Sequence, residues 1–392
     1  MLQLIPPEAL GQVLATFGAL LAAGLGAAGA AIGIGFSGSA MIGTIAEKPE
    51  TFSKSMIAVV LAEALGIYGL LASFMILMRL PTITNMVQGM IALGAGLSIG
   101  IAAIGAGIGI AYAGSSMCTS LAEAPETFSK ALVSVVLAEA LGIYGLLASF
   151  MLLMRIEGAS AANPGAGLIA IAAGIAIGIA AVGAGIGIAK SGSSLCKSLV
   201  RAPETFSKGL VSVVLAEALG IYGLLIGFMV VMRIDSVAAA PDVAQAMAQG
   251  FLAISAGSSI SLAALGGGIG IGLGGAALCA SLRFAPETFS KGLVAVVLAE
   301  ALGIYGLLAA FMLVMRMDAV TIGTAFTGLS AALTVGVGGL VAGVAIGFAG
   351  ASMVGALVNK PEVFSKSMVP VVLAEALAIY TLLVAFMLIM QI

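Results

Sequence analysis

One segment of the chain recurs five times with almost the same residues. Residues 125–155 read PETFSKALVSVVLAEALGIYGLLASFMLLMR, and the corresponding segments begin at Pro49, Pro203, Pro286 and Pro361. In every copy a glutamate follows the proline by fourteen residues without an insertion. Such a repeat predicts one small structural unit that is stacked on copies of itself. The repeat divides the chain into five units, at residues 1–80, 81–155, 156–233, 234–316 and 317–392.

Each unit contains two apolar stretches of membrane-spanning length. The first is rich in glycine and alanine, as in residues 94–117, and the second follows the Pro-Glu pair. Between Lys54 and Arg79 lie 24 residues with one charge, Glu63. They make about 36 Å of helix, which is enough to cross a bilayer core. The sequence therefore predicts an all-α membrane protein with ten transmembrane helices, arranged as five tandem helical hairpins.

Composition agrees with this prediction and excludes several classes of protein. Charged residues make up 8% of the chain and hydrophobic residues 61%, whereas about 25% of a typical soluble domain is charged. Net charge is −2 and there is no histidine. A basic surface for nucleic acid, a His-based catalytic triad and a His-ligated metal site are thus excluded. We expect no cofactor and no metal site.

Polar residues mark the turns and linkers. Within each hairpin the turn is polar, as in AEKPETFSK at 46–54, and its proline is well placed to open the second helix. Between hairpins we expect polar linkers at residues 81–85, 157–164, 235–245 and 318–321. The first ten residues lack the positive segment of a signal peptide, so we expect the N-terminus to be retained.

Basic residues predict the orientation in the membrane. Eleven of the fifteen are assigned to the Pro-Glu turns, and the other four are arginines at the far ends of the second helices. Cytoplasmic loops carry an excess of Lys and Arg, so these turns should face the cytoplasm and both termini the opposite side. The eleven are Lys48, Lys54, Lys130, Lys190, Lys197, Arg201, Lys208, Arg283, Lys291, Lys360 and Lys366.

Glycine-rich runs occur in the first helix of every unit, for example GAGIGI at 105–110. A nucleotide-binding loop would need a preceding strand or a following Gly-Lys-Ser/Thr, and neither is present. Small residues at this spacing allow close helix packing in membranes. We therefore expect the Gly/Ala helices to form a crowded inner layer and the bulkier second helices an outer layer that faces lipid. The three cysteines, Cys118, Cys196 and Cys279, are interpreted as packing residues.

The second glutamate of each unit is the strongest candidate for a functional residue. A carboxylate inside a bilayer costs about 2.5–3.5 kcal/mol or more and is usually functional. Each glutamate lies nine residues beyond the turn lysine, about 13 Å along the helix. Desolvation favours the neutral acid, which can carry a proton through an apolar environment. These candidate proton carriers are Glu63, Glu139, Glu217, Glu300 and Glu375.

Release of that proton requires a cationic partner. We assign all basic residues to turns and helix ends, so no Lys or Arg of this chain is expected at the depth of the glutamates. The cationic partner is therefore expected on another polypeptide. A tyrosine follows each glutamate by five residues, offset by about 140° on the same helix. It either fills an interface between helices, or its hydroxyl bonds a carboxylate on another helix across a packed ring of hairpins. The tyrosines are Tyr68, Tyr144, Tyr222, Tyr305 and Tyr380.

At this point the chain resembles a known family. The Gly-rich first helix, the Pro-Glu turn and the glutamate in AEALGIYGLL look like the proteolipid (c or K) subunit of rotary ATPases. The V/A type is the better match, for example at KPEVFSKSMVPVVLAEALAIYTLL, residues 360–383. The resemblance covers essentially the whole chain, once per hairpin. Family chains commonly hold one or two hairpins, and fused members often lose some carboxylates, whereas here five hairpins each keep one.

The resemblance implies a non-catalytic subunit of a two-layered membrane rotor ring, turned by ion binding at the glutamates. The implied partners are a stator (a or I) subunit that bears an arginine, a central-stalk subunit on the cytoplasmic turns and further copies of the chain. Five hairpins alone make too small a circle for two concentric helix layers, so more than one chain is expected. Two chains with ten carboxylates are favoured over three with fifteen. A passive pore is an alternative, although the Gly/Ala helices offer no polar lining.

Sodium-type relatives place Ser or Thr after the glutamate and Gln on the first helix. Here the residue after each glutamate is alanine, and the position 29 before it is isoleucine, as at Ile110 and Ile188. Sodium requires several oxygen ligands, whereas a proton requires only the carboxyl group. The sequence favours H⁺ as the coupling ion, with Na⁺ as the alternative.

Overall fold

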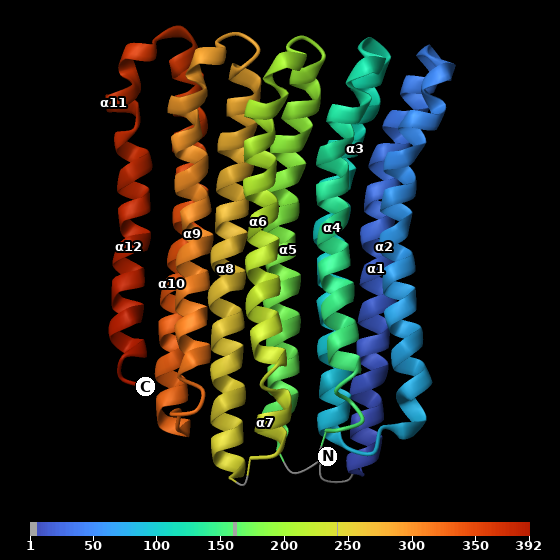
Figure 1. Cartoon of the computed structure of the whole chain (residues 1–392), viewed down its shortest axis with the longest axis vertical. Coiled ribbons are helices and arrows are strands. Elements are labelled where there is room, and N and C mark those ends of the chain that lie inside the picture. The colour runs from blue at the N-terminus through green and yellow to red at the C-terminus, as the bar shows by residue number, and fades with distance from the viewer. Residues whose placement is uncertain (1–5, 160–162, 241) are drawn as a thin grey trace.

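The computed structural model describes residues 6–159, 163–240 and 242–392, and these residues form helices, turns and short connections without a strand. Parts of two expected linkers, residues 160–162 and 241, and residues 1–5 of the N-terminus lie outside the described residues. Within the described part of the chain, ten helices are long and apolar enough to cross a membrane. The predicted all-α architecture of five hairpins is confirmed (Figure 1).

Each hairpin pairs a long first helix with a second helix across a Pro-Glu turn. The five turns are short 3₁₀ segments that begin at the proline, whose missing N–H is tolerated at the first helical position. The five pairs are α1 (Pro7–Glu47) with α2 (Phe52–Arg79), α3 (Met86–Glu123) with α4 (Phe128–Leu153), α5 (Pro164–Leu199) with α6 (Phe206–Val231), α8 (Val243–Ser281) with α9 (Phe289–Met315), and α10 (Ile322–Asn359) with α11 (Phe364–Ser367) and α12 (Val369–Ile389).

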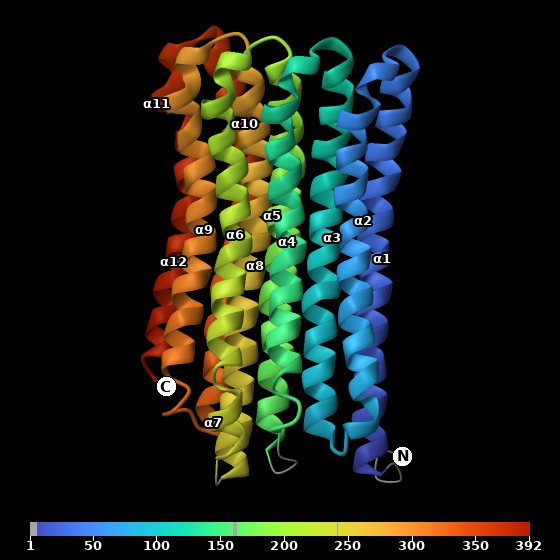
Figure 2. The same cartoon turned by 45° about the vertical axis from the view of Figure 1, so that its right-hand side comes forward.

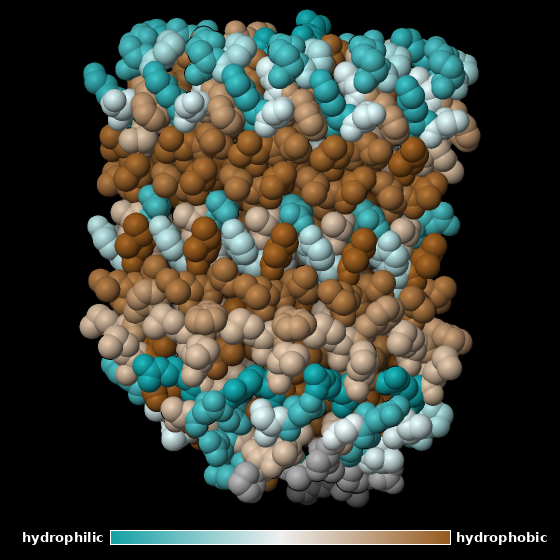
Figure 3. Space-filling view, viewed as in Figure 1, coloured by the Kyte–Doolittle hydropathy of each residue, from teal (hydrophilic) through white to brown (hydrophobic). Residues whose placement is uncertain are grey.

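All five turns lie at one end of the molecule, and the start of α1 and the C-terminus lie at the other (Figure 1). The hairpins stand side by side in chain order in both views (Figures 1 and 2). Figure 3 shows a broad hydrophobic band between two hydrophilic ends, as a membrane protein requires. A row of regularly spaced hydrophilic patches crosses that band.

Glycine allows the first helices to touch through their backbones. A Cβ atom built on Gly107 of α3 would collide with the carbonyl oxygen of Gly29 on α1. The same collision would occur at the other three joints, which are the contacts between consecutive hairpins. There a Cβ atom on Gly185, Gly268 or Gly343 would collide with the carbonyl oxygen of Gly105, Gly183 or Gly266, respectively. Only small residues permit such an approach between membrane helices. The predicted crowded layer of Gly/Ala helices is therefore present.

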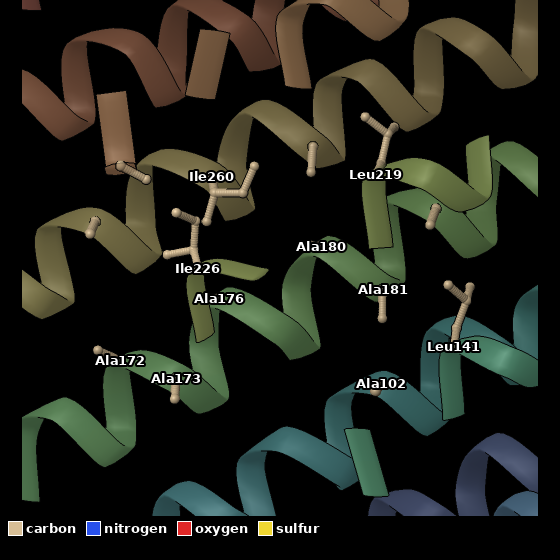
Figure 4. Close-up of a cluster of buried hydrophobic side chains, with 14 of the residues drawn as sticks. Ala102, Leu141, Ala172, Ala173, Ala176, Ala180, Ala181, Leu219, Ile226 and Ile260 are labelled. Atoms are coloured by element: carbon tan, nitrogen blue, oxygen red, sulfur yellow. The ribbon is translucent and has the colours of Figure 1, made fainter. Parts of the chain in front are cut away.

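The second helices contact one another through side chains instead. Leu141 of α4 reaches Gly220 of α6, where a Cβ built on the glycine would lie 2.6 Å from its Cδ2 atom. Figure 4 shows the small alanines of α5, such as Ala176 and Ala180, beside the larger side chains of Leu141, Leu219 and Ile226. Because the second helices stand further apart than the first, the double layer curves, with the Gly/Ala helices on its concave side.

Two features of the structure differ from the sequence expectations for the linkers and helices. The segment expected as linker 235–245 contains a short helix, α7 (Ile234–Ala238), and the start of α8. In the fifth hairpin the second helix is divided after Ser367, three residues before Pro370. Proline lacks the N–H for the helical hydrogen bond and its ring crowds the preceding turn, which accounts for the division.

Three of the four arginines at the far ends of the second helices bind the next hairpin. Arg155 forms an ion pair with Asp235, and Arg233 forms one with Asp318. Arg79 donates a hydrogen bond to the carbonyl oxygen of Leu153. These bonds join consecutive hairpins at the end opposite the Pro-Glu turns.

Candidate ion-binding site

The five glutamates lie on the second helices at equivalent positions. Each follows an alanine, and in the first four hairpins this alanine packs against a glycine of the first helix of the same hairpin. A Cβ atom built on Gly187 of α5 would lie 2.7 Å from the Cβ atom of Ala216, the neighbour of Glu217. Gly109 and Ala138 make the same contact beside Glu139, at 2.6 Å. In these four hairpins the contact fixes the height and rotation of the carboxylate relative to the first helix, whereas the fifth hairpin has Ala345 in place of the glycine.

Each internal glutamate accepts a hydrogen bond from the tyrosine of the preceding hairpin. Tyr68 of α2 donates to Glu139, and Tyr144 of α4 donates to Glu217. Tyr222 donates to Glu300 at 2.7 Å, and Tyr305 donates to Glu375 at 2.9 Å. The carboxylate sites therefore lie between hairpins, and each needs residues from two of them.

In the second, third and fourth hairpins, a glycine three residues after the glutamate makes room for a leucine of the preceding hairpin, beside the tyrosine. In α4 it is Gly142, where a Cβ atom would collide with the side chain of Leu65 and lie 3.7 Å from the Cδ2 atom of Tyr68. Gly220 has the same relation to Leu141 and Tyr144. The sequence interpretation did not single out this glycine, although its recurrence in the first four units is visible in GIYG.

The four carboxylates that have a preceding hairpin are shielded to different degrees, since Glu139 and Glu217 are buried and Glu300 and Glu375 are partly exposed. Glu139 and Glu217 are each 7% exposed, whereas Glu63, which has no hairpin before it in the chain, is exposed. The five hairpins together form a curved double layer, here called the arc. At its other end, Tyr380 has no following hairpin and is 61% exposed. The first and last hairpins therefore each hold half of one further site.

Two positions that could supply side-chain oxygen ligands to a cation hold apolar residues in every hairpin. The isoleucines at the position 29 residues before the glutamates are fully buried in the last four hairpins, at Ile110, Ile188, Ile271 and Ile346. The residue after each glutamate is alanine, and the tyrosine hydroxyl is the hydrogen-bond donor found for each internal site. Among the described residues no group of three Cys, Asp or Glu side chains is arranged to hold a metal ion.

The turn end of each hairpin repeats a second contact with its neighbour. Lys130 donates to the carbonyl oxygen of Pro203 at 2.8 Å, and its ammonium lies over the ring of Phe206. Lys54, Lys208 and Lys291 make the equivalent pairs of contacts with the next hairpins. These lysines anchor each second helix nine residues from its glutamate.

The assignment of Lys190 to a Pro-Glu turn is wrong, because α5 continues through this residue to Leu199. Lys190 lies three residues beyond Gly187, and so about 4.5 Å along the helix from the level of Glu217. The expectation that no cation lies near this depth is thus corrected. Lys190 is exposed on the concave side and leans over Gly272 of α8. It forms no ion pair with a glutamate within the described structure.

Comparison with protein families matches the repeat directly. The family of ATP synthase C subunits matches residues 17–76, 93–152, 171–230, 254–313 and 329–388, one match per hairpin. The chain belongs to this family. The five matches establish it as a fused, multi-hairpin proteolipid, and each match includes one glutamate and one tyrosine of the site.

Similar proteins come from archaea and eukaryotes. The K subunit of the A-type ATP synthase of Methanocaldococcus jannaschii is 36% identical over 57% of this chain and 97% of its own length. The 16 kDa proteolipid of the human V-type proton ATPase is 34% identical over 35% of this chain and 89% of its own length. Subunit c of the V-type proton ATPase of Candida tropicalis is 36% identical over 32% of this chain and 74% of its own length. The resemblance to V/A-type proteolipids is confirmed.

Proposed function

We propose that this chain is a non-catalytic subunit of the rotor ring of a V/A-type ATPase and carries one ion on each of its five glutamates. The observation that carries the proposal is the Tyr–Glu hydrogen bond between consecutive hairpins, as between Tyr222 and Glu300 at 2.7 Å. A neutral carboxyl held by such a bond can travel through lipid, since its charge is removed and its oxygen is satisfied. Rotation then carries every glutamate past one fixed exchange point.

Exchange of the ion requires a cation on the convex side of the ring. Lys190 lies on the opposite, concave side, so it is not suited to this role. The arginine of the stator subunit, which the family resemblance implies, would face the glutamates from outside. A positive charge close to the carboxyl favours the ionised form and thus proton release.

The coupling ion follows from the surroundings of the carboxyl. Fully buried isoleucine and the alanine after each glutamate supply no side-chain oxygen, whereas a hard cation needs several oxygen ligands. H⁺ is the ion that this environment supports, and Na⁺ is the alternative. Millimolar Na⁺ should leave the reaction of the glutamates with a carbodiimide unchanged, and strong protection by Na⁺ would instead identify a sodium site.

A second copy of the chain supplies the missing halves of the end sites. Tyr380 of one copy would donate to Glu63 of the next, and Lys366 would reach the carbonyl oxygen of Pro49, as in the four joints within the chain. Closed cyclic arrangements are the common outcome for identical subunits. The hairpin count of the ring is then a multiple of five, with two chains favoured and three possible, which a projection image of the ring would test.

The joint between copies differs from those within the chain in the inner layer. At the positions where glycines touch, the terminal helices carry Ala31 on α1 and Val341 on α10, and both are exposed in the single chain. Their side chains keep these two helices further apart than Gly29 and Gly107. We therefore expect a wider spacing of the inner helices at each joint between copies.

The Pro-Glu turns would face the cytoplasm and contact the central-stalk subunit, and both termini would face the other side. The excess of Lys and Arg at the turn end supports this orientation. A passive pore is the competing function. It would need a water-filled polar path, and the backbone contacts between the Gly/Ala helices leave no room for one between neighbouring hairpins.

The variant Glu217→Gln tests the proposal in the assembled complex. It keeps the size and the hydrogen-bond capacity of the side chain but cannot ionise. Because every site must pass the stator in turn, one dead site in each chain should stall ion-coupled ATP turnover. Glu204→Gln, at the turn of the same hairpin, should leave turnover intact. Retention of most coupled turnover by Glu217→Gln would contradict the rotor model, and ion conductance of the purified chain alone would support a pore.

A further inference from the structure

Among the five first helices, as far as the structure describes them, α5 is the one that carries lysines. Lys190 and Lys197 lie seven residues apart on α5, and hence on one side of that helix. Arg201 follows four residues later, just beyond the end of α5, and Arg283 follows the end of α8 in the same way. The other first helices have no such stripe. The residues of α1 and α3 that correspond to Lys190 are Phe36 and Tyr112.

These cations border a pocket at the turn end of the first helices. It has a volume of about 230 Å³ and is lined by Thr119, Ser120 and Glu123 of α3 together with Lys197, Arg201 and Arg283. Three positive side chains thus face one carboxylate. Within the described residues the ion pairs lie elsewhere, between Arg155 and Asp235 and between Arg233 and Asp318. The pocket therefore holds uncompensated positive charge.

Arg283 adds an unsatisfied donor. Its Nε atom is buried and has no hydrogen-bond partner, while its guanidinium lies over the ring of Phe284, 5.5 Å from the centroid. A buried arginine donor without a partner is costly. An anionic oxygen in the pocket would pair with this guanidinium and relieve part of that cost.

The neighbouring pocket has the opposite charge. Between α1 and α3 the corresponding space is lined by Glu47 and Glu123 and contains no Lys or Arg. An anion is therefore attracted to the sector between α3 and α8 and repelled from the one beside it. This difference predicts one anion site per chain and not one per hairpin.

Lys190 indicates what kind of anion the sector takes. It lies nine residues inside the end of α5, about 14 Å from the turn, at a depth where a lysine is expensive unless its amine reaches toward an anion. The concave surface at the same register is apolar, with Phe36, Tyr112 and Phe348 all more than half exposed. A soluble acidic protein would contact the turns but not this depth.

We propose that the concave face of each chain binds one anionic phospholipid. Its phosphodiester group occupies the pocket beside Lys197, Arg201 and Arg283, and its acyl chains lie along the apolar concave surface next to Lys190. Basic pockets between membrane helices on the cytoplasmic side bind anionic headgroups in this way. The lipid would fill the space inside the arc and does not depend on ion exchange at the glutamates.

Native mass spectrometry of the detergent-solubilised ring tests the proposal. The ring is stripped of lipid and titrated with phosphatidylglycerol or, in parallel, with phosphatidylcholine. We expect phosphatidylglycerol to bind tightly at one molecule per chain. The double variant Arg201→Gln/Arg283→Gln should weaken this binding roughly 30-fold, since each cation near an anionic lipid contributes about a factor of five.

Two further variants separate this site from general charge effects. Lys48→Gln/Lys360→Gln removes the same charge from turn positions outside the pocket and should leave lipid binding unchanged. Lys190→Leu introduces the residue that α8 has at the equivalent position, Leu273, and should weaken binding about fivefold with the turns intact.

Several results would overturn the proposal. One is equal binding of phosphatidylglycerol and phosphatidylcholine, and another is an equal loss in the two double variants. Displacement of the lipid by millimolar inorganic phosphate would identify a site for the free anion. If Arg201→Gln/Arg283→Gln kept its lipid but released the water-soluble part of the complex, the cluster would bind an acidic protein instead.

Discussion

Tyr222 of α6 donates a hydrogen bond to Glu300 of α9, one hairpin further along the chain, at 2.7 Å. The tyrosine therefore belongs to the site of the next glutamate and not to its own. Four joints of the chain repeat this relation. Each of these four carboxylates is bonded across the contact between two hairpins, so the proposed ion sites would form only as the hairpins pack together.

Removal of one hydroxyl should affect one site. In Tyr222→Phe, Glu300 loses its hydrogen-bond donor and its carboxyl becomes freer to react, so carbodiimide labelling of Glu300 should accelerate about two- to tenfold, as expected for a hydrogen bond of roughly 0.5–1.5 kcal/mol. Peptide mapping by mass spectrometry measures the rate for each glutamate.

Tyr112→Phe is the matched control for this experiment. Tyr112 packs beside Phe36 on the concave face, with the ring centroids 5.7 Å apart, and contacts no glutamate. Its loss should leave all five rates unchanged. Acceleration at Glu217 in place of Glu300 in the Tyr222→Phe ring would show that the tyrosine serves its own hairpin.

Backbone contact between the first helices should be sensitive to a single side chain. A Cβ atom on Gly29 would collide with the carbonyl oxygen of Ala103 and lie 3.0 Å from the amide nitrogen of Ile104. Gly29→Val should therefore push α1 away from α3 and lower the stability of the ring by about 1–3 kcal/mol. The fraction of monodisperse ring after heating reports the loss.

Gly43→Val on the same helix serves as the control, since a Cβ atom there has no neighbour within 4 Å. It should behave like the unchanged chain. Equal stability of the two variants would mean that α1 and α3 are not held by close backbone packing.

The joint between two copies should be open to chemical cross-linking. By analogy with Leu65 beside Gly142, Leu377 of one copy should lie beside Gly66 of the next. After replacement of the three native cysteines by alanine, Leu377→Cys/Gly66→Cys with a short bismaleimide should give covalent dimers, and the largest product should reveal the number of chains per ring. The pair Leu141→Cys/Gly220→Cys lies within one chain, so its cross-link should add only the mass of the reagent and give no covalent dimer. Only monomers from the first pair would mean that a different subunit separates the copies.

The fold was accessible from the sequence because one pattern is repeated five times at fixed spacing. The apolar lengths, the proline at each turn and the Gly/Ala bias of the first helices predict the hairpins and the two layers. The short helix α7 was missed, since five residues of Ile234–Ala238 carry no periodic signal. Lys190 was misplaced because a lysine near other basic residues was read as part of a turn, although the first helix continues well past it.

The site could be predicted only in part. The repeated glutamate is visible in the sequence, and the 140° offset of the tyrosine indicates that it does not face its own glutamate. Which neighbouring glutamate it reaches depends on the order in which the hairpins pack, and local periodicity does not contain that information. The role of Gly142 and Gly220, which make room for a leucine of the preceding hairpin, became clear only from the packed structure.

Carbodiimide labelling of the coupled, intact complex, mapped to individual residues, tests the central claim most directly. The reagent attacks protonated carboxyls in apolar surroundings, so the account predicts labelling at Glu63, Glu139, Glu217, Glu300 and Glu375, with loss of ion-coupled ATP turnover. Glu63 should react like the others, because a neighbouring copy completes its site. Labelling confined to turn residues such as Glu50, Glu126 or Glu287, or full labelling of the five glutamates without loss of turnover, would contradict it.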